Sequence, residues 1–176
     1  GPFPVILQAT RYWRASILAD GTLKTLLEGN DSPARFLLEH GYVVVKYDVR
    51  GSGASFGQMG EHTSPIQGQD SYDIIEWVGA QHWSTGKVGM IGGSFLGEAQ
   101  IAAAATHPPS LKAIFPASVE FDTVEHLHQH GAPVRAPLSY FAATERMDGN
   151  KKSANNAKHA GLLKDMLDNR AAPAPV

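Results

Sequence analysis

A single serine stands among three glycines in the segment MIGGSFLGEA, residues 90–99. The apolar residues before Gly92 are typical of a short strand, and the alanine-rich stretch after Gly97 is typical of a helix. A serine at a tight strand-to-helix turn is the pattern of a nucleophile elbow, whose hydroxyl projects away from the sheet. Glycines around a serine are also found in phosphate-binding loops. The segment therefore predicts either nucleophilic chemistry on Ser94 or phosphate binding.

The nucleophile interpretation explains both the small residues and the position of the next amide. Gly92 lies two residues before Ser94, where a small residue lets the strand and the helix approach closely. The following residue, Phe95, offers a backbone N–H at the N-terminus of the predicted helix. That N–H and the helix dipole can stabilise an oxyanion. The usual G-x-S-x-G spacing is not kept, because Leu96 stands two residues after the serine and the glycine follows at Gly97.

The phosphate-binding interpretation has less support from the spacing. In residues 92–97 the second glycine directly follows the first, so the order is not G-x-G-x-x-G, and the chain has no GxxxxGK[ST] segment. A second glycine-rich segment, residues 51–57, follows a predicted strand. Its third glycine comes one place late and no helix begins after it. Dinucleotide binding at Gly51–Gly57 is thus the rival interpretation.

Strands and helices alternate along the first two thirds of the chain. The β-branched or apolar runs predict strands at 5–9, 42–47, 87–91 and 111–116, and the helical patterns lie at 33–39, 70–78 and 98–107. This order predicts an α/β fold, a mostly parallel sheet with helices on both faces. In the second helix, Tyr72, Ile75 and Trp77 are expected to face the core, and Trp83 is expected to pack beside it. After residue 121 no further strand is expected.

Composition excludes several classes of function. The 176 residues are 43% hydrophobic and 18% charged, which is typical of a soluble globular protein. The net charge is −2 and no basic cluster is present, so nucleic-acid or membrane-surface binding has no electrostatic basis. The longest apolar runs are too short to span a bilayer. The absence of cysteine excludes disulfides and thiolate metal sites and suits a cytoplasmic protein, although a secreted one is equally compatible.

Four segments resemble one enzyme family in the same order. Residues 83–97, WSTGKVGMIGGSFLG, resemble the W-S-x-G-K-V-G-M-x-G-x-S-Y-L-G stretch of the cocaine esterase-like hydrolases. These hydrolases belong with the Xaa-Pro dipeptidyl-peptidases in the S15 group of α/β-hydrolases. Residues 47–57 are similar to the family's D-x-R-G-x-G-x-S-x-G loop, and residues 111–116 to its L-K-A-I-x-P strand. Residues 4–13 resemble the strand that ends in an R/N-x-x-Y turn.

The resemblance implies a serine hydrolase that acts through an acyl-enzyme. The family carries its nucleophile in G-x-S-[YF]-x-G, which implies that Ser94 is the nucleophile and explains the glycine at position 97. It also implies that the hydroxyl of Tyr12 is the second oxyanion donor, beside the N–H of Phe95. The expected substrate is a small ester or amide, with a short Xaa-Pro peptide as the alternative. No cofactor and no metal are expected.

The base and the acid of a catalytic triad are not apparent in the sequence. In α/β-hydrolases they follow the serine in the order Asp, then His, on loops after later strands. No further strand is recognised after the predicted strand at 111–116, so both residues are expected beyond Val176. The downstream candidates are His107, His126, His128, His130, His159, Asp122, Asp148, Asp165 and Asp168. Asp48 and Arg50 are instead expected to fix the turn after their strand.

The sequence thus predicts the nucleophile half of a hydrolase, in two parts. Residues 1–121 are assigned to a truncated α/β-hydrolase core, and residues 122–176 to an incomplete helical cap. An inactive domain without its Asp and His is the alternative, and exposed sheet edges favour a homo-oligomer. The segment HLHQH, residues 126–130, is interpreted as solvated or substrate-facing rather than metal-binding, because no H-E-x-x-H pattern accompanies it.

Overall fold

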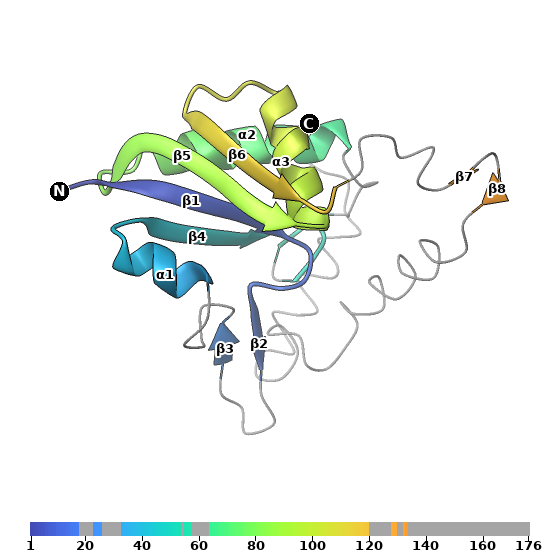
Figure 1. Cartoon of the computed structure of the whole chain (residues 1–176), viewed down its shortest axis with the longest axis horizontal. Coiled ribbons are helices and arrows are strands. Elements are labelled where there is room, and N and C mark those ends of the chain that lie inside the picture. Colours follow the sequence, from blue (N-terminus) through green and yellow to red (C-terminus); the bar gives the residue numbers. More distant parts are fainter. Residues whose placement is uncertain are drawn as a thin grey trace.

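A parallel four-stranded sheet forms the centre of the computed structural model, which describes residues 1–17, 23–25, 33–53, 55–57, 64–119, 128–129 and 132–133 (Figure 1). The spatial order of the strands is β4-β1-β5-β6. These are β1 (Phe3–Thr10), β4 (Val43–Asp48), β5 (Ser84–Gly93) and β6 (Leu111–Ala117). Every neighbouring pair is parallel. The four predicted strands and their parallel arrangement are confirmed.

Three helices cover the two faces of this sheet. They are α1 (Pro33–Glu39), α2 (Pro65–Gly79) and α3 (Phe95–Ala105). The chain moves from β1 to its neighbour β4, then crosses back over β1 to β5 and continues to β6. Because such crossovers are right-handed, this reversal places α1 on one face and the other two helices on the opposite face. Accordingly, α1 contacts β4, whereas α2 and α3 pack against each other and against β1 and β5.

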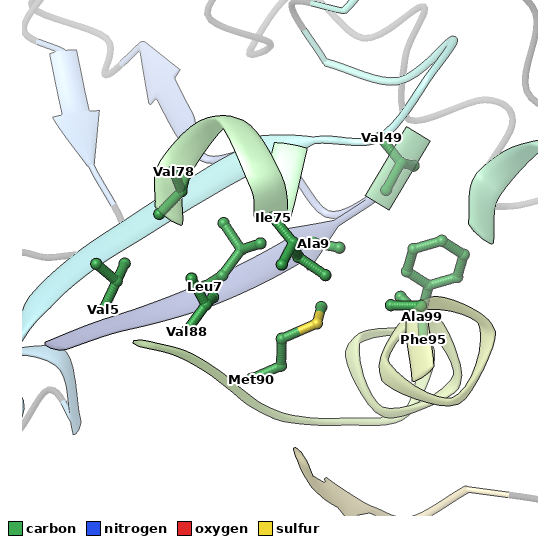
Figure 2. Close-up of a cluster of buried hydrophobic side chains, with 11 residues drawn as sticks. Val5, Leu7, Ala9, Val49, Ile75, Val78, Val88, Met90, Phe95 and Ala99 are labelled. Atoms are coloured by element: carbon green, nitrogen blue, oxygen red, sulfur yellow. The ribbon is translucent and has the colours of Figure 1, made fainter. Parts of the chain in front are cut away.

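The main hydrophobic core lies between the sheet and the pair α2 and α3 (Figure 2). Alternate residues of the two central strands enter it, because successive side chains of a strand point to opposite faces. The strand residues are Val5, Leu7, Ala9, Val88 and Met90, and the helices supply Ile75, Val78, Phe95, Ala99 and Ala103. Phe95 is only 1% exposed. Its burial fixes the first turn of α3 against the carboxyl ends of the strands.

Two predicted helices begin earlier in the structure than the sequence indicated. Helix α2 starts at Pro65 rather than at residue 70, since proline suits the first position of a helix, where its missing N–H costs nothing. Helix α3 starts at Phe95 rather than at residue 98, directly after Ser94. The glycine at position 97 therefore lies within the first turn of α3, and the turn before the helix is shorter than predicted.

The expectation that Trp77 faces the core is wrong. Its side chain is 60% exposed, whereas Ile75, two residues earlier, is completely buried. Two residues correspond to roughly 200° around an α-helix, so both cannot face the same side. Trp83 does pack, partly buried, against the core as predicted.

Two short antiparallel pairs were not predicted. Ala15–Ile17 (β2) pairs with Leu23–Thr25 (β3), and His128–Gln129 (β7) pairs with Ala132–Pro133 (β8). The expectation of no strand after residue 121 is therefore wrong. Strands of two or three residues contain too few positions to show an alternating pattern. Apart from β7 and β8, the predicted cap segment 122–176 lies outside the described residues, so the boundary at 121 stays a prediction.

A buried hydroxyl pair joins β4 to α2. The hydroxyl groups of Tyr47 and Ser71 share a hydrogen bond of 2.9 Å, and Ser71 Oγ donates to the carbonyl oxygen of Gln67. Burial raises the pKa of Tyr47 to about 12. The unfolded chain releases this proton at about pH 10. The stabilising contribution of Tyr47 is therefore complete below about pH 10 and is lost as the pH rises through about 12.

We expect Tyr47→Phe to reduce the fall in unfolding free energy that occurs at alkaline pH. The variant should lose about 1 kcal/mol of unfolding free energy at neutral pH, because one hydrogen bond disappears. Between about pH 10 and pH 12 its unfolding free energy should fall less steeply than that of the wild type. Chemical denaturation across this pH range measures both values, with the exposed Tyr42→Phe as the control. An unchanged alkaline slope in Tyr47→Phe would contradict the role of the buried phenol.

Candidate active site

Ser94 stands at the sharp turn between β5 and α3 with an unusual backbone conformation. Its φ is 56° and its ψ is −132°, a combination that side-chain-bearing residues rarely adopt. The N–H of Ser94 donates to the carbonyl oxygen of Ala117 at 3.0 Å, and its own carbonyl accepts from the N–H groups of Gly97 and Glu98. The residue is exposed to solvent. A strained, exposed serine between a strand and a helix is the geometry of a nucleophile elbow.

Two glycines make this turn possible, for different reasons. Gly92 has φ +148°, and a Cβ there would lie 2.5 Å from Cβ of Leu96. A Cβ at Gly97 would overlap Cγ1 of Val119 and lie 2.9 Å from the carbonyl oxygen of Ala117. Gly92 therefore makes room for the helix, and Gly97 makes room for the end of β6. The structure thus explains why glycine is needed at position 97 while a leucine is accommodated at position 96.

Tyr12 reaches the serine from the turn that follows β1. Its hydroxyl oxygen lies 3.2 Å from Ser94 Oγ, and the two groups share a hydrogen bond. The Tyr12 ring packs edge-on against Phe95, with centroids 6.4 Å apart and an interplanar angle of 78°. The guanidinium of Arg11 lies 5.6 Å from the centre of the same Phe95 ring, within the range of a cation–π contact. The structure therefore brings together all three site residues predicted from the sequence: Ser94, Phe95 and Tyr12.

Asp48 connects the Tyr12 turn to the end of β4. The N–H of Arg14 donates to Asp48 Oδ1 at 2.7 Å, and Arg14 Nε lies 3.4 Å from Oδ2. Asp48 itself is 4% exposed. Arg50, two residues further on, forms a two-pronged ion pair with Asp70 of α2, and this hydrogen bonding raises the pKa of Arg50. Arg50 thus ties the turn after β4 to α2, whereas Asp48, which was expected to fix the same turn, holds the turn after β1.

Side chains of the protein itself occupy the space beside the glycines of residues 51–57. A Cβ at Gly53 would lie 2.5 Å from Cγ of Asp48, and a Cβ at Gly57 would lie 2.9 Å from Cγ of Arg50. The space that these glycines open is thus filled by a carboxylate and an arginine. A carboxylate at that place would repel a phosphate. The geometry argues against the rival interpretation of this loop as a dinucleotide site.

The structure places the candidate histidines and aspartates only in part. His107 follows Thr106, the C-cap of α3, so it lies at the opposite end of that helix from Ser94, and the helix between them is about 16 Å long. His128 lies in β7. The other downstream histidines and aspartates fall outside the described residues. Within the described part of the chain, no cluster of three His, Asp or Glu residues could hold a metal, and no helix is long and apolar enough to cross a membrane.

One buried residue beside the elbow was missed in the sequence. Gln100 is completely buried in α3 and makes hydrogen bonds to three other residues. The available signal was a glutamine among alanines, six residues after Ser94 in a helix that must face the sheet. A polar side chain at such a position is buried only when it finds partners.

Known proteins share the fold and part of the sequence of this chain. The family described as X-Pro dipeptidyl-peptidase (S15 family) matches residues 1–175. A cocaine esterase from Rhodococcus is 36% identical over 123 residues, which cover 69% of this chain and 20% of that enzyme. A solved CocE/NonD family hydrolase from Staphylococcus aureus is 33% identical, with a TM-score of 0.54 over 65% of this chain and 22% of its own.

The matches cover most of this chain but only a small part of each relative. The chain spans about one fifth of the length of the curated relatives it matches. The relatives are hydrolases by name, and the sheet with its helices matches a solved α/β-hydrolase. With the family match over almost the whole chain, these findings show that the protein belongs to the CocE/S15 family of α/β-hydrolases.

Proposed function

We propose that this chain carries the nucleophile and the oxyanion donors of a serine hydrolase that cleaves an ester or amide bond of a small acyl substrate. The observation that carries the proposal is the exposed, strained Ser94 with the Tyr12 hydroxyl 3.2 Å from its Oγ. A serine used only to fill a turn would need neither that backbone strain nor that partner. Membership of a hydrolase family supports the same role.

In the proposed reaction, Ser94 Oγ attacks the substrate carbonyl and forms a tetrahedral intermediate. The new oxyanion is bonded to the carbon that Oγ attacks, so it forms within reach of the Tyr12 hydroxyl. The N–H of Phe95, at the positive end of the α3 dipole, is the second donor. Collapse of the intermediate releases the alcohol or amine and leaves an acyl group on Ser94, which water then hydrolyses. A general base from elsewhere in the full-length protein must accept the serine proton, since a serine hydroxyl is a weak nucleophile at neutral pH.

An Xaa-Pro dipeptidyl-peptidase is the second candidate, favoured by the description of the matching family. We prefer an esterase or acylase, because a relative that is 36% identical is a cocaine esterase and because a simple ester needs no recognition of a peptide amino terminus. The full-length protein should hydrolyse p-nitrophenyl acetate faster than Ala-Pro-p-nitroanilide. A preference for the dipeptide anilide would support the peptidase instead.

Tyr12→Phe should lower kcat by about a hundredfold with little change in KM. The lost hydroxyl donor acts on the oxyanion, which exists in the transition state and not in the bound substrate. Steady-state kinetics on p-nitrophenyl acetate would measure this effect. Tyr47→Phe is the matched control, because it removes a hydrogen-bonded phenol hydroxyl that joins β4 to α2 instead of facing Ser94. Equal kcat values for the two variants would exclude Tyr12 as an oxyanion donor.

A further inference from the structure

The side chain of Gln100 joins three elements around the elbow. Its Nε2 donates to the carbonyl oxygens of Gly92, at 3.1 Å, and Leu96, at 2.8 Å. Its Oε1 accepts from the N–H of Phe115 at 2.9 Å. Gly92 is the last but one residue of β5, Leu96 lies in the first turn of α3, and Phe115 belongs to β6. One buried amide thus holds the strand before the nucleophile, the helix after it and the neighbouring strand.

The two donated bonds bracket the nucleophile. Gly92 lies two residues before Ser94 and Leu96 two residues after it, so both ends of the strained segment are attached to the same nitrogen. A strained conformation of this kind costs about 1–3 kcal/mol and persists only when its surroundings hold it. Gln100 is 0% exposed, so these bonds are not exchanged with water. We propose that Gln100 is a positioning residue that keeps Ser94 in its reactive conformation.

This inference rests on the proposed role of Ser94 as nucleophile, and it goes beyond that role by naming what fixes the serine. The chemistry of the position is specific to an amide. The side chain of Gln100 donates two hydrogen bonds through its NH₂ group and accepts one through its carbonyl oxygen. Methionine can form none of these bonds, and an ionised glutamate can only accept. An apolar residue here would leave the carbonyl of Gly92 and the N–H of Phe115 without this partner.

The test compares Gln100→Met with Gln67→Met in the full-length protein. Gln67 is a matched control, because it is also a buried glutamine, 5% exposed, on the helix that packs against α3. The readouts are kcat and KM for p-nitrophenyl acetate and the rate at which a fluorophosphonate labels Ser94. We expect Gln100→Met to lower kcat and the labelling rate at least about tenfold with KM nearly unchanged, and Gln67→Met to change neither by more than about twofold.

A second variant covers the case in which Gln100→Met does not fold. Gln100→Glu has nearly the same shape and keeps the acceptor for Phe115, but when ionised it donates nothing to Gly92 or Leu96. It should show the same loss of kcat and labelling rate. If both Gln100 variants matched Gln67→Met in labelling rate and kcat, the role of Gln100 would be overturned while the proposed function would stand. Failure of the wild type to be labelled at Ser94 would instead overturn the proposed function, and the inference with it.

Discussion

Ser94→Ala should lower kcat for p-nitrophenyl acetate in the full-length protein by about a million-fold, leaving only the small residual catalysis that the oxyanion donors and substrate binding supply. The variant removes the only atom of Ser94 that can form the acyl-enzyme. The fold should be kept, because the backbone bonds from Ser94 to Ala117, Gly97 and Glu98 do not involve the hydroxyl. The loss should therefore appear in kcat and in fluorophosphonate labelling, while the unfolding temperature changes little.

A serine at the other end of the same strand provides the control for this experiment. Ser84 begins β5, and its hydroxyl oxygen accepts a hydrogen bond from the N–H of Gly86. Ser84→Ala removes one hydroxyl from the same strand but leaves the elbow intact, so its kcat should stay within about twofold of the wild type. If Ser94→Ala kept ester hydrolysis and Ser84→Ala did not differ from it, Ser94 could not be the nucleophile.

Gly92→Ala should cause the second large effect, a loss of both stability and labelling. The added methyl would lie 2.5 Å from Cβ of Leu96, which is part of the first turn of α3 and cannot rotate away. Overpacking of this kind costs about 1–3 kcal/mol, and the φ of +148° adds strain of about 1–3 kcal/mol for alanine. A loss of this size is a large fraction of the stability of an ordinary domain.

The control for Gly92 separates backbone strain from steric overlap. Gly86 also has a positive φ, +74°, but a Cβ there would meet nothing closer than 3.9 Å. Gly86→Ala should therefore cost only the strain, about 1 kcal/mol, and leave the labelling of Ser94 unchanged. Thermal unfolding and fluorophosphonate labelling of the two variants make the comparison. Equal unfolding temperatures and equal labelling rates would show that Gly92 is not required for close approach of β5 and α3.

The sequence alone determined the order of the four strands and three helices of the central sheet, and the place of the candidate nucleophile. Strands β1 and β5 show as apolar runs, because a parallel sheet buries its central strands on both faces, and the edge strands β4 and β6 show as similar runs. The elbow shows as glycines at fixed offsets from Ser94, because a sharp turn between two packed elements excludes Cβ atoms at particular positions. Such requirements are local in the chain, and the residue types record them directly. The family resemblance rested on the same local segments.

Only the tertiary structure decided how distant residues meet. Tyr12 and Ser94 are 82 residues apart in the chain, and their hydroxyl contact exists because β1 and β5 are neighbours in the sheet. The family resemblance suggested the role of Tyr12, but no pattern within the chain measures that distance. Two hydrogen bonds of Gln100, to Gly92 and to Phe115, likewise depend on the packing of α3 against β5 and β6. Contacts between elements follow from the summed packing of many side chains, so no single residue type encodes them.

The exposed Trp77 and the early start of α3 are two further features that the tertiary structure decided. An aromatic residue in a helix predicts burial only on average, whereas the helical angle relative to Ile75 turned Trp77 towards solvent. Ser94 was recognised from its neighbours, but the first residue of α3 was set by the burial of Phe95 against the sheet. The sequence therefore determined which residue is the candidate nucleophile, and the packing of the sheet and helices determined what surrounds it.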